Sequence, residues 1–319
     1  QIEAVVADNK SEPAEAANAI TKLINQDKVV AVTGTFSSSN AIAAASVAEA
    51  AKVPYLAAGA TNPKVTVDEK SGKVFDYVFR VCFIDPFQGT VMANYAFQNG
   101  AKNAAVITQL GDDYSSGLGA FFKSAFSSFG EIVAEEQFQT NQTDFKASLT
   151  NIKDKNPEVI FAPSSIATAP LIIKQARELG ITCPIMAGDT WENATIIENV
   201  GEYTQDIYLS TFFDEDGVDE AGAAFITGFK EYLTTNGQSD IIPAVSALGY
   251  DAYNVLIDAI EAADSVEPTA IRDALTTVET TGVTGAISFN ENGDANKDMA
   301  FIKTVEDGSF KFLKTVTVE

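Results

Sequence analysis

The chain has 319 residues, 46% of them hydrophobic and 20% charged, so it has enough apolar area for about two globular domains. Its 44 acidic and 21 basic side chains give a net charge of −23, which disfavours binding to nucleic acid or to anionic membrane surfaces. Because histidine is absent, Ser–His and Cys–His nucleophile pairs and His-ligated zinc are excluded. The chain also lacks a G-x-G-x-x-G after the first predicted strand and a Walker loop, so nucleotide binding has no local support. We expect neither an enzyme nor a bound cofactor.

Short β-branched runs alternate with segments of helical period, a pattern typical of βαβ units with parallel sheets. The predicted strands are residues 2–7, 29–32, 55–58, 77–81, 104–108, 132–138, 159–162, 184–187, 206–211, 286–289 and 299–305. The predicted helices begin at about 12, 40, 87, 115 and 144, and the later ones cover 168–179, 221–232, 244–263 and 268–278. Ser11 and Thr143 are expected to cap two of these helices through their hydroxyl groups.

The two cysteines, Cys82 and Cys183, lie far apart in the sequence and do not have metal-ligand spacing. We expect both to be free thiols, not bonded to each other. No apolar run is long enough for a transmembrane helix, so no membrane insertion is expected. No signal peptide or lipid-attachment cysteine opens the chain, so any export segment is expected to have been removed or never to have been part of this sequence.

Hydroxyl side chains follow two neighbouring predicted strands. Ser37 and Ser38 lie between a strand and a helix, and Gly59-Ala60-Thr61 follows the next strand. Hydroxyl groups and free N–H groups at a helix N-terminus can bind an anion, although the serines could equally form an ordinary helix cap. Because the carboxyl ends of parallel strands meet at one edge of a sheet, the two loops together favour a pocket.

Acidic and aromatic residues occupy similar positions further along the chain. Asp189 directly follows a predicted strand and offers a partner to a cation, and Tyr114 and Trp191 could line a pocket. The plain alternatives are a solvated or capping carboxylate and ordinary packing of the two rings. Asp112 and Asp113 have no further ligands spaced around them, so we expect no metal site.

Several short segments carry a further signal when taken together. They are Phe36-Ser37-Ser38-Ser39, Gly59-Ala60-Thr61-Asn62-Pro63, Phe79-Arg80 before Asp85, Asp113-Tyr114-Ser115-Ser116-Gly117, Thr143-Asp144-Phe145 leading to Asn156-Pro157-Glu158-Val159, and Gly249-Tyr250-Asp251-Ala252. From residue 1 to about 289 the chain resembles the leucine/isoleucine/valine-binding periplasmic receptors. These are type I solute-binding proteins of ABC importers. The resemblance implies an α/β fold of two doubly wound parallel-sheet lobes, joined by three crossovers and closing on the ligand like a flytrap.

The resemblance also assigns roles to individual residues. Ser37 and Thr61 would hold the ligand carboxylate, and the Gly59 carbonyl would accept from the α-ammonium group. Asp189 matches an acidic ammonium partner that is a glutamate in the branched-chain receptors, and Tyr114 matches a tyrosine near the ammonium. The complete expected ligand-binding set is Ser37, Ser38, Gly59, Ala60, Thr61, Tyr114, Ser164, Asp189, Trp191 and Tyr250.

Two departures from the family pattern bear on ligand and architecture. Ser164 and Ser165 stand where those receptors carry an aromatic wall, which weakens the case for a large aliphatic ligand and favours a small neutral amino acid. Family members also begin with a strand–loop–helix unit ahead of the strand predicted at 2–7. Either the sequence lacks its true N-terminus or another chain supplies that unit.

The resemblance implies an extracytoplasmic, monomeric receptor, periplasmic or a cell-surface lipoprotein, that delivers an amino acid to an ABC-transporter permease. Crossovers are expected near Asp85, Asp214 and Phe289. The first lobe would hold residues 1–85 and 214–289, and the second 86–213 and 290–319. The alternative is a sensory ligand-binding module of the same fold that reports an amide or amino acid to a regulator. The partner recovered with the protein, a permease or a regulator, would separate the two.

Overall fold

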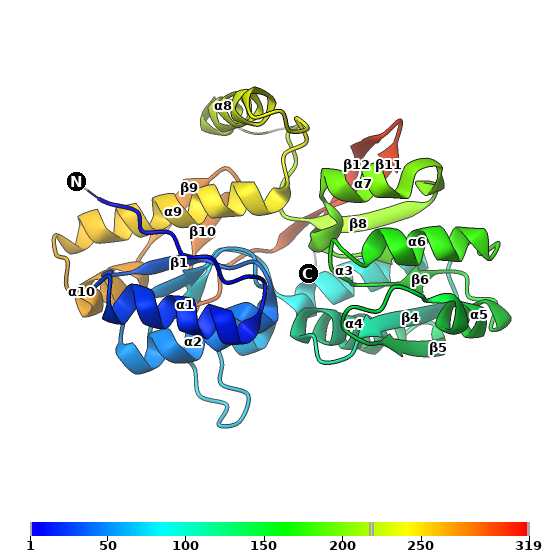
Figure 1. Cartoon of the computed structure of the whole chain (residues 1–319), viewed down its shortest axis with the longest axis horizontal. Helices are drawn as coiled ribbons and strands as arrows, with labels where there is room; N and C mark the ends of the chain where they lie inside the picture. The colour runs from blue at the N-terminus through cyan, green and yellow to red at the C-terminus, as the bar shows by residue number, and fades with distance from the viewer. Residues whose placement is uncertain (1, 217, 219, 318–319) are drawn as a thin grey trace. The chain divides into compact units, whose positions relative to one another are not determined.

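The computed structural model describes residues 2–216, 218 and 220–317, which form two compact units (Figure 1). Unit 1 consists of Gln1–Ile84 and Val245–Lys297, and unit 2 of Asp85–Ala244 and Asp298–Glu319. Residues 1, 217, 219, 318 and 319, which the expected division includes, lie outside the described part. Each unit therefore combines two segments that are separate in the sequence.

The boundaries between the units differ from the expected division at all three crossovers, and at the first the difference is a single residue, because Asp85 is grouped with unit 2. Residues 214–244 are grouped with unit 2, where the rings of Phe213 and Phe225 lie 6.2 Å apart and Lys230 pairs with Glu215. Residues 290–297 are grouped with unit 1, because this segment forms backbone hydrogen bonds with Arg80.

Unit 1 is built on a three-stranded parallel sheet in the order β1-β2-β3. Its strands are β1 (Val32–Gly34), β2 (Tyr55–Ala57) and β3 (Val78–Arg80), and an antiparallel pair is formed by β9 (Glu279–Gly282) and β10 (Gly285–Ser288). Its helices are α1 (Pro13–Asn25), α2 (Ser38–Ala51), α9 (Ala244–Ala263), which starts at the unit boundary, and α10 (Pro268–Leu275). Helix α2 packs on α1 and on the sheet, and its alanine face brings the backbones close together.

Unit 2 contains a seven-stranded sheet in the order β12-β11-β8-β7-β6-β4-β5. Its strands are β4 (Asn103–Gln109), β5 (Glu131–Phe138), β6 (Ile160–Phe161), β7 (Ile185–Ala187), β8 (Ile207–Thr211), β11 (Met299–Glu306) and β12 (Ser309–Thr317). Its helices are α3 (Asp85–Gln98), α4 (Asp113–Phe126), α5 (Lys146–Asp154), α6 (Ala169–Glu178), α7 (Ala194–Val200) and α8 (Glu220–Thr235). Strands β4 to β8 are parallel, whereas β11 is antiparallel to both of its neighbours.

Helices cover both faces of this larger sheet, because its buried strands alternate apolar side chains between the faces. Ile107, Ile160 and Ala187 belong to a core that also contains side chains of α5, α6 and α7. On the neighbouring position of β6, Phe161 turns the other way and stacks on Phe122 of α4, with ring centroids 4.1 Å apart. The parallel strands then all end at one edge of the sheet, where their loops gather.

Three local predictions are wrong. Residues 2–7 do not form a strand: they pair with none of the described strands, and Val6 is 90% exposed. Ser11 and Thr143 do not cap helices, since Glu12 and Phe145 occupy the N-cap positions and neither makes a side-chain capping bond. Strands β9 and β12 and helix α7 were not predicted at all.

Both cysteines are free thiols, as expected, and they lie in different units. Within the described residues, none of the helices combines the length and the apolar character needed to cross a bilayer.

Candidate ligand-binding site

The loops at the carboxyl edge of the unit 1 sheet bring five of the expected residues together. Ser37 occupies the N-cap of α2, and its hydroxyl makes no capping bond to the helix. Ser38 Oγ accepts a hydrogen bond from the Asn62 backbone N–H at 3.2 Å, which links the start of α2 to the loop after β2. That loop contains Gly59, Ala60 and Thr61, all of them buried.

Thr61 is the least satisfied of these groups. Its side chain is completely buried, yet Oγ1 has no hydrogen-bond partner among the described residues. Leaving a buried hydroxyl unpaired costs about 1–3 kcal/mol, so such a group points to a ligand atom. Gly59 beside it cannot carry a larger side chain, because a Cβ would lie 2.6 Å from the Phe36 ring.

A second cluster surrounds Asp189, which follows β7 in a short turn at the carboxyl edge of the unit 2 sheet. Its side chain is 3% exposed, and Oδ1 accepts hydrogen bonds from Gln88 Nε2 at 2.9 Å and from Tyr114 Oη at 3.3 Å. Oδ2 is buried and has no partner among the described residues. This carboxylate therefore has one oxygen left for a hydrogen-bond donor.

Burial controls the protonation of this cluster. It raises the pKa of Asp189 to about 7, and the hydrogen bonds from Gln88 and Tyr114 offset only part of that effect. Burial, together with the charge of Asp189, also raises the pKa of Tyr114 well above its ordinary value, so the phenol stays a donor. A carboxylate kept in this state becomes fully ionised near neutral pH when a cation approaches it.

Gln88 and Gly188 were not predicted. Gln88, on α3, is fully buried, and its Nε2 also donates to Ser210 Oγ at 3.0 Å, while its Oε1 lacks a partner among the described residues. At Gly188 a Cβ would lie 2.5 Å from Tyr114 Oη and 2.8 Å from Gln88 Nε2, so only glycine lets both donors approach Asp189. A glutamine on a buried, mostly apolar helix face was the available sequence signal for Gln88.

Ser164 and Trp191 lie near this cluster and pack beside it, and their contact with a ligand stays a prediction. Trp191 is fully buried in the core of unit 2, and its Nε1 donates to Ser164 Oγ at 3.3 Å. The Ser164 carbonyl accepts from Thr190 Oγ1 at 2.8 Å, and Thr190 in turn bonds Tyr114 Oη. Their side chains thus support the turn that carries Asp189. Tyr250 lies on α9 of unit 1 and is 45% exposed, so its role in binding stays a prediction.

A buried cluster of charged side chains adjoins the turn that carries Asp189, because Glu192 belongs to both. The Glu192 backbone N–H closes the turn on the Asp189 carbonyl, and the Glu192 carboxylate accepts from Lys303 Nζ at 2.5 Å. Lys303 also reaches Asp214 Oδ2 at 3.0 Å, and Thr211 Oγ1 donates to the other Glu192 oxygen. Burial raises the pKa of Glu192, while the Lys303 ammonium partly counteracts this. The pairing links β11, the end of β8 and the Asp189 turn.

Polar side chains gathered at the carboxyl edges of the sheets in two α/β units are typical of proteins that bind a small solute. The chain belongs to the periplasmic binding protein family, whose sequence profile matches residues 1–309. This is a family of solute-binding proteins, not of enzymes. The family resemblance and the two-lobed fold expected from the sequence are thereby confirmed.

Curated relatives carry amino-acid names. An "Amino acid binding protein" of Pseudomonas aeruginosa is 31% identical over 72% of this chain and 61% of its own length. The chain thus spans less than two thirds of that relative. The "Leucine-, isoleucine-, valine-, threonine-, and alanine-binding protein" of the same organism is 23% identical over 92% of this chain and 76% of its own.

Two solved structures share the fold over nearly the whole chain. The leucine-binding protein LivK of Thermotoga maritima is 37% identical, with a TM-score of 0.88 over 97% of this chain and 86% of that one. The branched-chain amino acid binding protein LivJ of Streptococcus pneumoniae, in complex with isoleucine, is 33% identical. Its TM-score is 0.89, over 100% of this chain and 88% of that one.

Proposed function

We propose that this protein is an extracytoplasmic receptor that binds a neutral aliphatic amino acid and delivers it to the permease of an ABC importer. One observation carries the proposal: each unit holds a buried oxygen without a partner among the described residues, Thr61 Oγ1 in unit 1 and Asp189 Oδ2 in unit 2. The names of LivK, LivJ and the two Pseudomonas relatives support it.

The unit 1 cluster suits the carboxylate end of an amino acid. A hydroxyl that makes no capping bond stands at the N-cap of α2, on Ser37, and a second, on Thr61, is buried without a partner among the described residues. The helix N-terminus adds a partial positive charge at the same place. Hydroxyl and amide donors of this kind form short, charge-assisted hydrogen bonds with a carboxylate.

The unit 2 cluster suits the ammonium end. Asp189 and the Gln88 carbonyl oxygen both offer acceptors that lack donors among the described residues, and an α-ammonium group carries three N–H donors. Burying a zwitterion is tolerable only if both of its ends are paired, which clusters of opposite character provide. The partners that the two clusters offer are matched by the carboxylate and the ammonium group of the amino acid, so we expect a neutral side chain to be favoured over a charged one.

Delivery to a permease requires the two lobes to close on the solute. A ligand that contacts both lobes stabilises the closed state over the open one and so shifts an existing equilibrium. A membrane permease recovered with the ligand-loaded protein supports this role, whereas recovery of a regulatory protein favours the sensory alternative.

A thermal-shift screen of the free amino acids tests the function directly, with benzoate as a carboxylate that lacks an amine. A ligand at about 100 times its Kd raises the free energy of unfolding by about 2.7 kcal/mol. We expect stabilisation by isoleucine or smaller aliphatic amino acids and none by benzoate. Stabilisation by benzoate alone would contradict the proposal.

The affinity is expected to fall at acid pH. Asp189 has a pKa of about 7 without ligand, and an ammonium group beside it lowers that value, so binding releases a proton below pH 7. The affinity should therefore drop by up to about tenfold per pH unit below 7 and be flat above it. Calorimetry in two buffers of different ionisation enthalpy measures the proton release. Asp189→Asn should abolish this release, and its persistence in that variant would assign the proton to another group.

Removing the unit 1 hydroxyls should weaken binding without lowering stability. Ser37→Ala and Thr61→Val are each expected to cost about 1–3 kcal/mol of binding free energy, since a donor to a charged group is lost while backbone donors remain. Thr61→Val should not destabilise the ligand-free protein, because it removes a buried hydroxyl without a partner. Ser46→Ala, on the exposed side of α2, is the matched control and should leave the calorimetric Kd unchanged. Unchanged binding by both variants would remove the carboxylate site from unit 1.

A further inference from the structure

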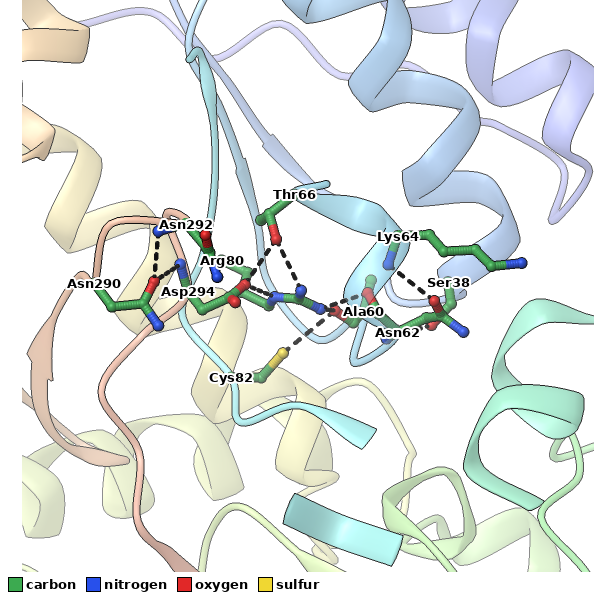
Figure 2. A network of polar contacts seen from close by, with 10 residues as sticks. All are labelled: Ser38, Ala60, Asn62, Lys64, Thr66, Arg80, Cys82, Asn290, Asn292 and Asp294. Atoms are coloured by element: carbon green, nitrogen blue, oxygen red, sulfur yellow. Dashed lines mark hydrogen bonds and ion pairs between the residues drawn. The ribbon is translucent and has the colours of Figure 1, made fainter. Parts of the chain in front are cut away.

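Arg80 is a fully buried cation at the end of β3 whose hydrogen bonds converge on the loop after β2 (Figure 2). Nη1 donates to the backbone carbonyls of Ala60 at 2.9 Å and Asn62 at 2.7 Å. Nη2 donates to Thr66 Oγ1 at 3.0 Å. One guanidinium group thus holds the residues on both sides of Thr61.

These contacts fix the direction in which the backbone N–H of Thr61 points. The described chain contains no cis peptide bonds, so the Thr61 N–H points away from the Ala60 carbonyl and hence away from Arg80. The next N–H, that of Asn62, is taken by Ser38 Oγ at 3.2 Å. With both flanking carbonyls turned to the guanidinium and the Asn62 N–H bonded to Ser38, the backbone on both sides of Thr61 is held in one orientation.

Asp294 holds Arg80 in place from a distant part of the chain. Its Oδ1 lies 2.5 Å from Arg80 Nε and also accepts from Thr66 Oγ1 at 2.9 Å. The backbone is tied as well, because Arg80 N–H donates to the Gly293 carbonyl and Ala295 N–H donates to the Arg80 carbonyl. Gly293 has φ +76°, and a Cβ there would lie 2.4 Å from the Val78 carbonyl oxygen, so this approach needs glycine.

We propose that Arg80, held by Asp294, is a positioning residue for the carboxylate half of the binding site. The inference rests on the proposed amino-acid function and extends it to two residues that would not touch the ligand. A buried ion pair by itself adds little stability compared with well-packed apolar side chains. The planar fork of an arginine, unlike a lysine, can hold two carbonyls and a carboxylate at once. By holding the carbonyls of Ala60 and Asn62, the guanidinium group fixes the backbone orientation of Thr61 between them.

A double-mutant cycle with L-isoleucine, titrated by calorimetry, tests the proposal. Arg80→Lys keeps the charge and loses the fork, and we expect it to weaken isoleucine binding by about 10- to 100-fold, the range for losing a hydrogen bond to a charged group. In the Thr61→Val background, Arg80→Lys should cost less than half as much on a logarithmic scale, because both changes remove the same interaction. With Asp189→Asn the two effects should simply multiply.

Arg177→Lys is the matched control. Arg177 also holds backbone carbonyls, those of Ile181, Cys183 and Gln205, but these precede β7 and β8 and so lie at the opposite edge of the unit 2 sheet from Asp189. The Arg177→Lys variant should therefore leave the Kd for isoleucine unchanged. Should Arg80→Lys fail to fold, Asp294→Asn removes the partner of the guanidinium and is expected to show the same coupling to Thr61→Val.

The outcomes separate this inference from the function on which it rests. A parent protein that binds neither isoleucine nor alanine contradicts the proposed function. A parent that binds isoleucine and is weakened by Thr61→Val, but in which Arg80→Lys acts additively with Thr61→Val or leaves the Kd unchanged, overturns the role of Arg80 alone. A purely structural arginine would give that additive result, together with a lower unfolding temperature.

Discussion

Asp189→Ala is expected to weaken amino-acid binding by roughly 2–5 kcal/mol, the cost of leaving a buried charge without its partner. The carboxylate is 3% exposed, and its Oδ2 has no hydrogen-bond donor among the described residues. In the variant the ammonium group of the ligand would therefore be left unpaired. Calorimetric titration of parent and variant with isoleucine measures the difference. Equal affinities would refute the amino-acid assignment.

Replacing Asp189 by asparagine should affect the stability of the ligand-free protein in the opposite direction. Burial raises the pKa of Asp189 to about 7, so the ligand-free folded state holds this proton more tightly than the unfolded chain does. Stability is therefore lost as pH rises from the unfolded pKa through 7, and the neutral Asp189→Asn variant should escape that loss. We expect it to unfold at a higher temperature than the parent at pH 8. Asp154→Ala, an exposed change at the end of α5, is the control and should alter neither quantity.

Lys303→Met is expected to destabilise unit 2 by about 3–5 kcal/mol at neutral pH, because it leaves the buried carboxylates of Glu192 and Asp214 without a cation. The Lys303 side chain is 6% exposed, and those of its partners are 2% and 8% exposed. Protonation relieves the repulsion between the two acids. Burial already raises the pKa of Glu192, so the deficit should shrink as pH falls.

Urea unfolding, monitored by tryptophan fluorescence, measures the loss of stability of unit 2 in Lys303→Met. The chain has a single tryptophan, Trp191, which is buried in the core of unit 2. Lys123→Met breaks an exposed ion pair with Glu135 in the same unit, and as a control it should cost less than about 1 kcal/mol. A deficit no larger than that of this control would show that Lys303 carries little of the stability of the unit.

Helices were predicted well where a long stretch of chain repeated one pattern. Helix α9 has the predicted bounds, Ala244–Ala263. Its twenty residues follow the helical period, contain no proline and have no glycine near either end, so the sequence leaves little doubt about where the helix begins and ends. Residues 2–7 have the alternation of a strand, but a strand also needs a neighbour, and none of the described strands pairs with them. Pairing is a tertiary property that local pattern does not contain.

Strand β12 was missed although its turn carried a signal. Asp307 and Gly308 connect β11 to β12 with φ of 50° and 73°, the left-handed geometry for which Asp-Gly is a strong hairpin indicator. The strand itself alternates lysine and threonine with apolar residues, and most of its side chains are exposed. Apolar periodicity was therefore weak there, and turn chemistry would have been the better guide.

Residues of the candidate site could be predicted from the sequence where they lie in a loop directly after a parallel strand. Ser37, Thr61 and Asp189 were chosen because parallel strands end at one edge, and the structure places each of them in such a loop. Gln88 comes from a helix, and Lys303 reaches Glu192 across 111 residues of sequence. Contacts of that range depend on the folded chain, so neither residue could be found from spacing alone.

The way the chain passes between the units also sets the order in which they can form. Unit 1 needs Val245–Lys297, which a ribosome releases after almost all of unit 2, and unit 2 needs β11, which lies between β8 and β12. A domain made of one continuous segment can fold while the rest is still being synthesised. Here each unit needs a segment that follows most of the other unit in the sequence, so neither can be completed before Lys297 has been synthesised.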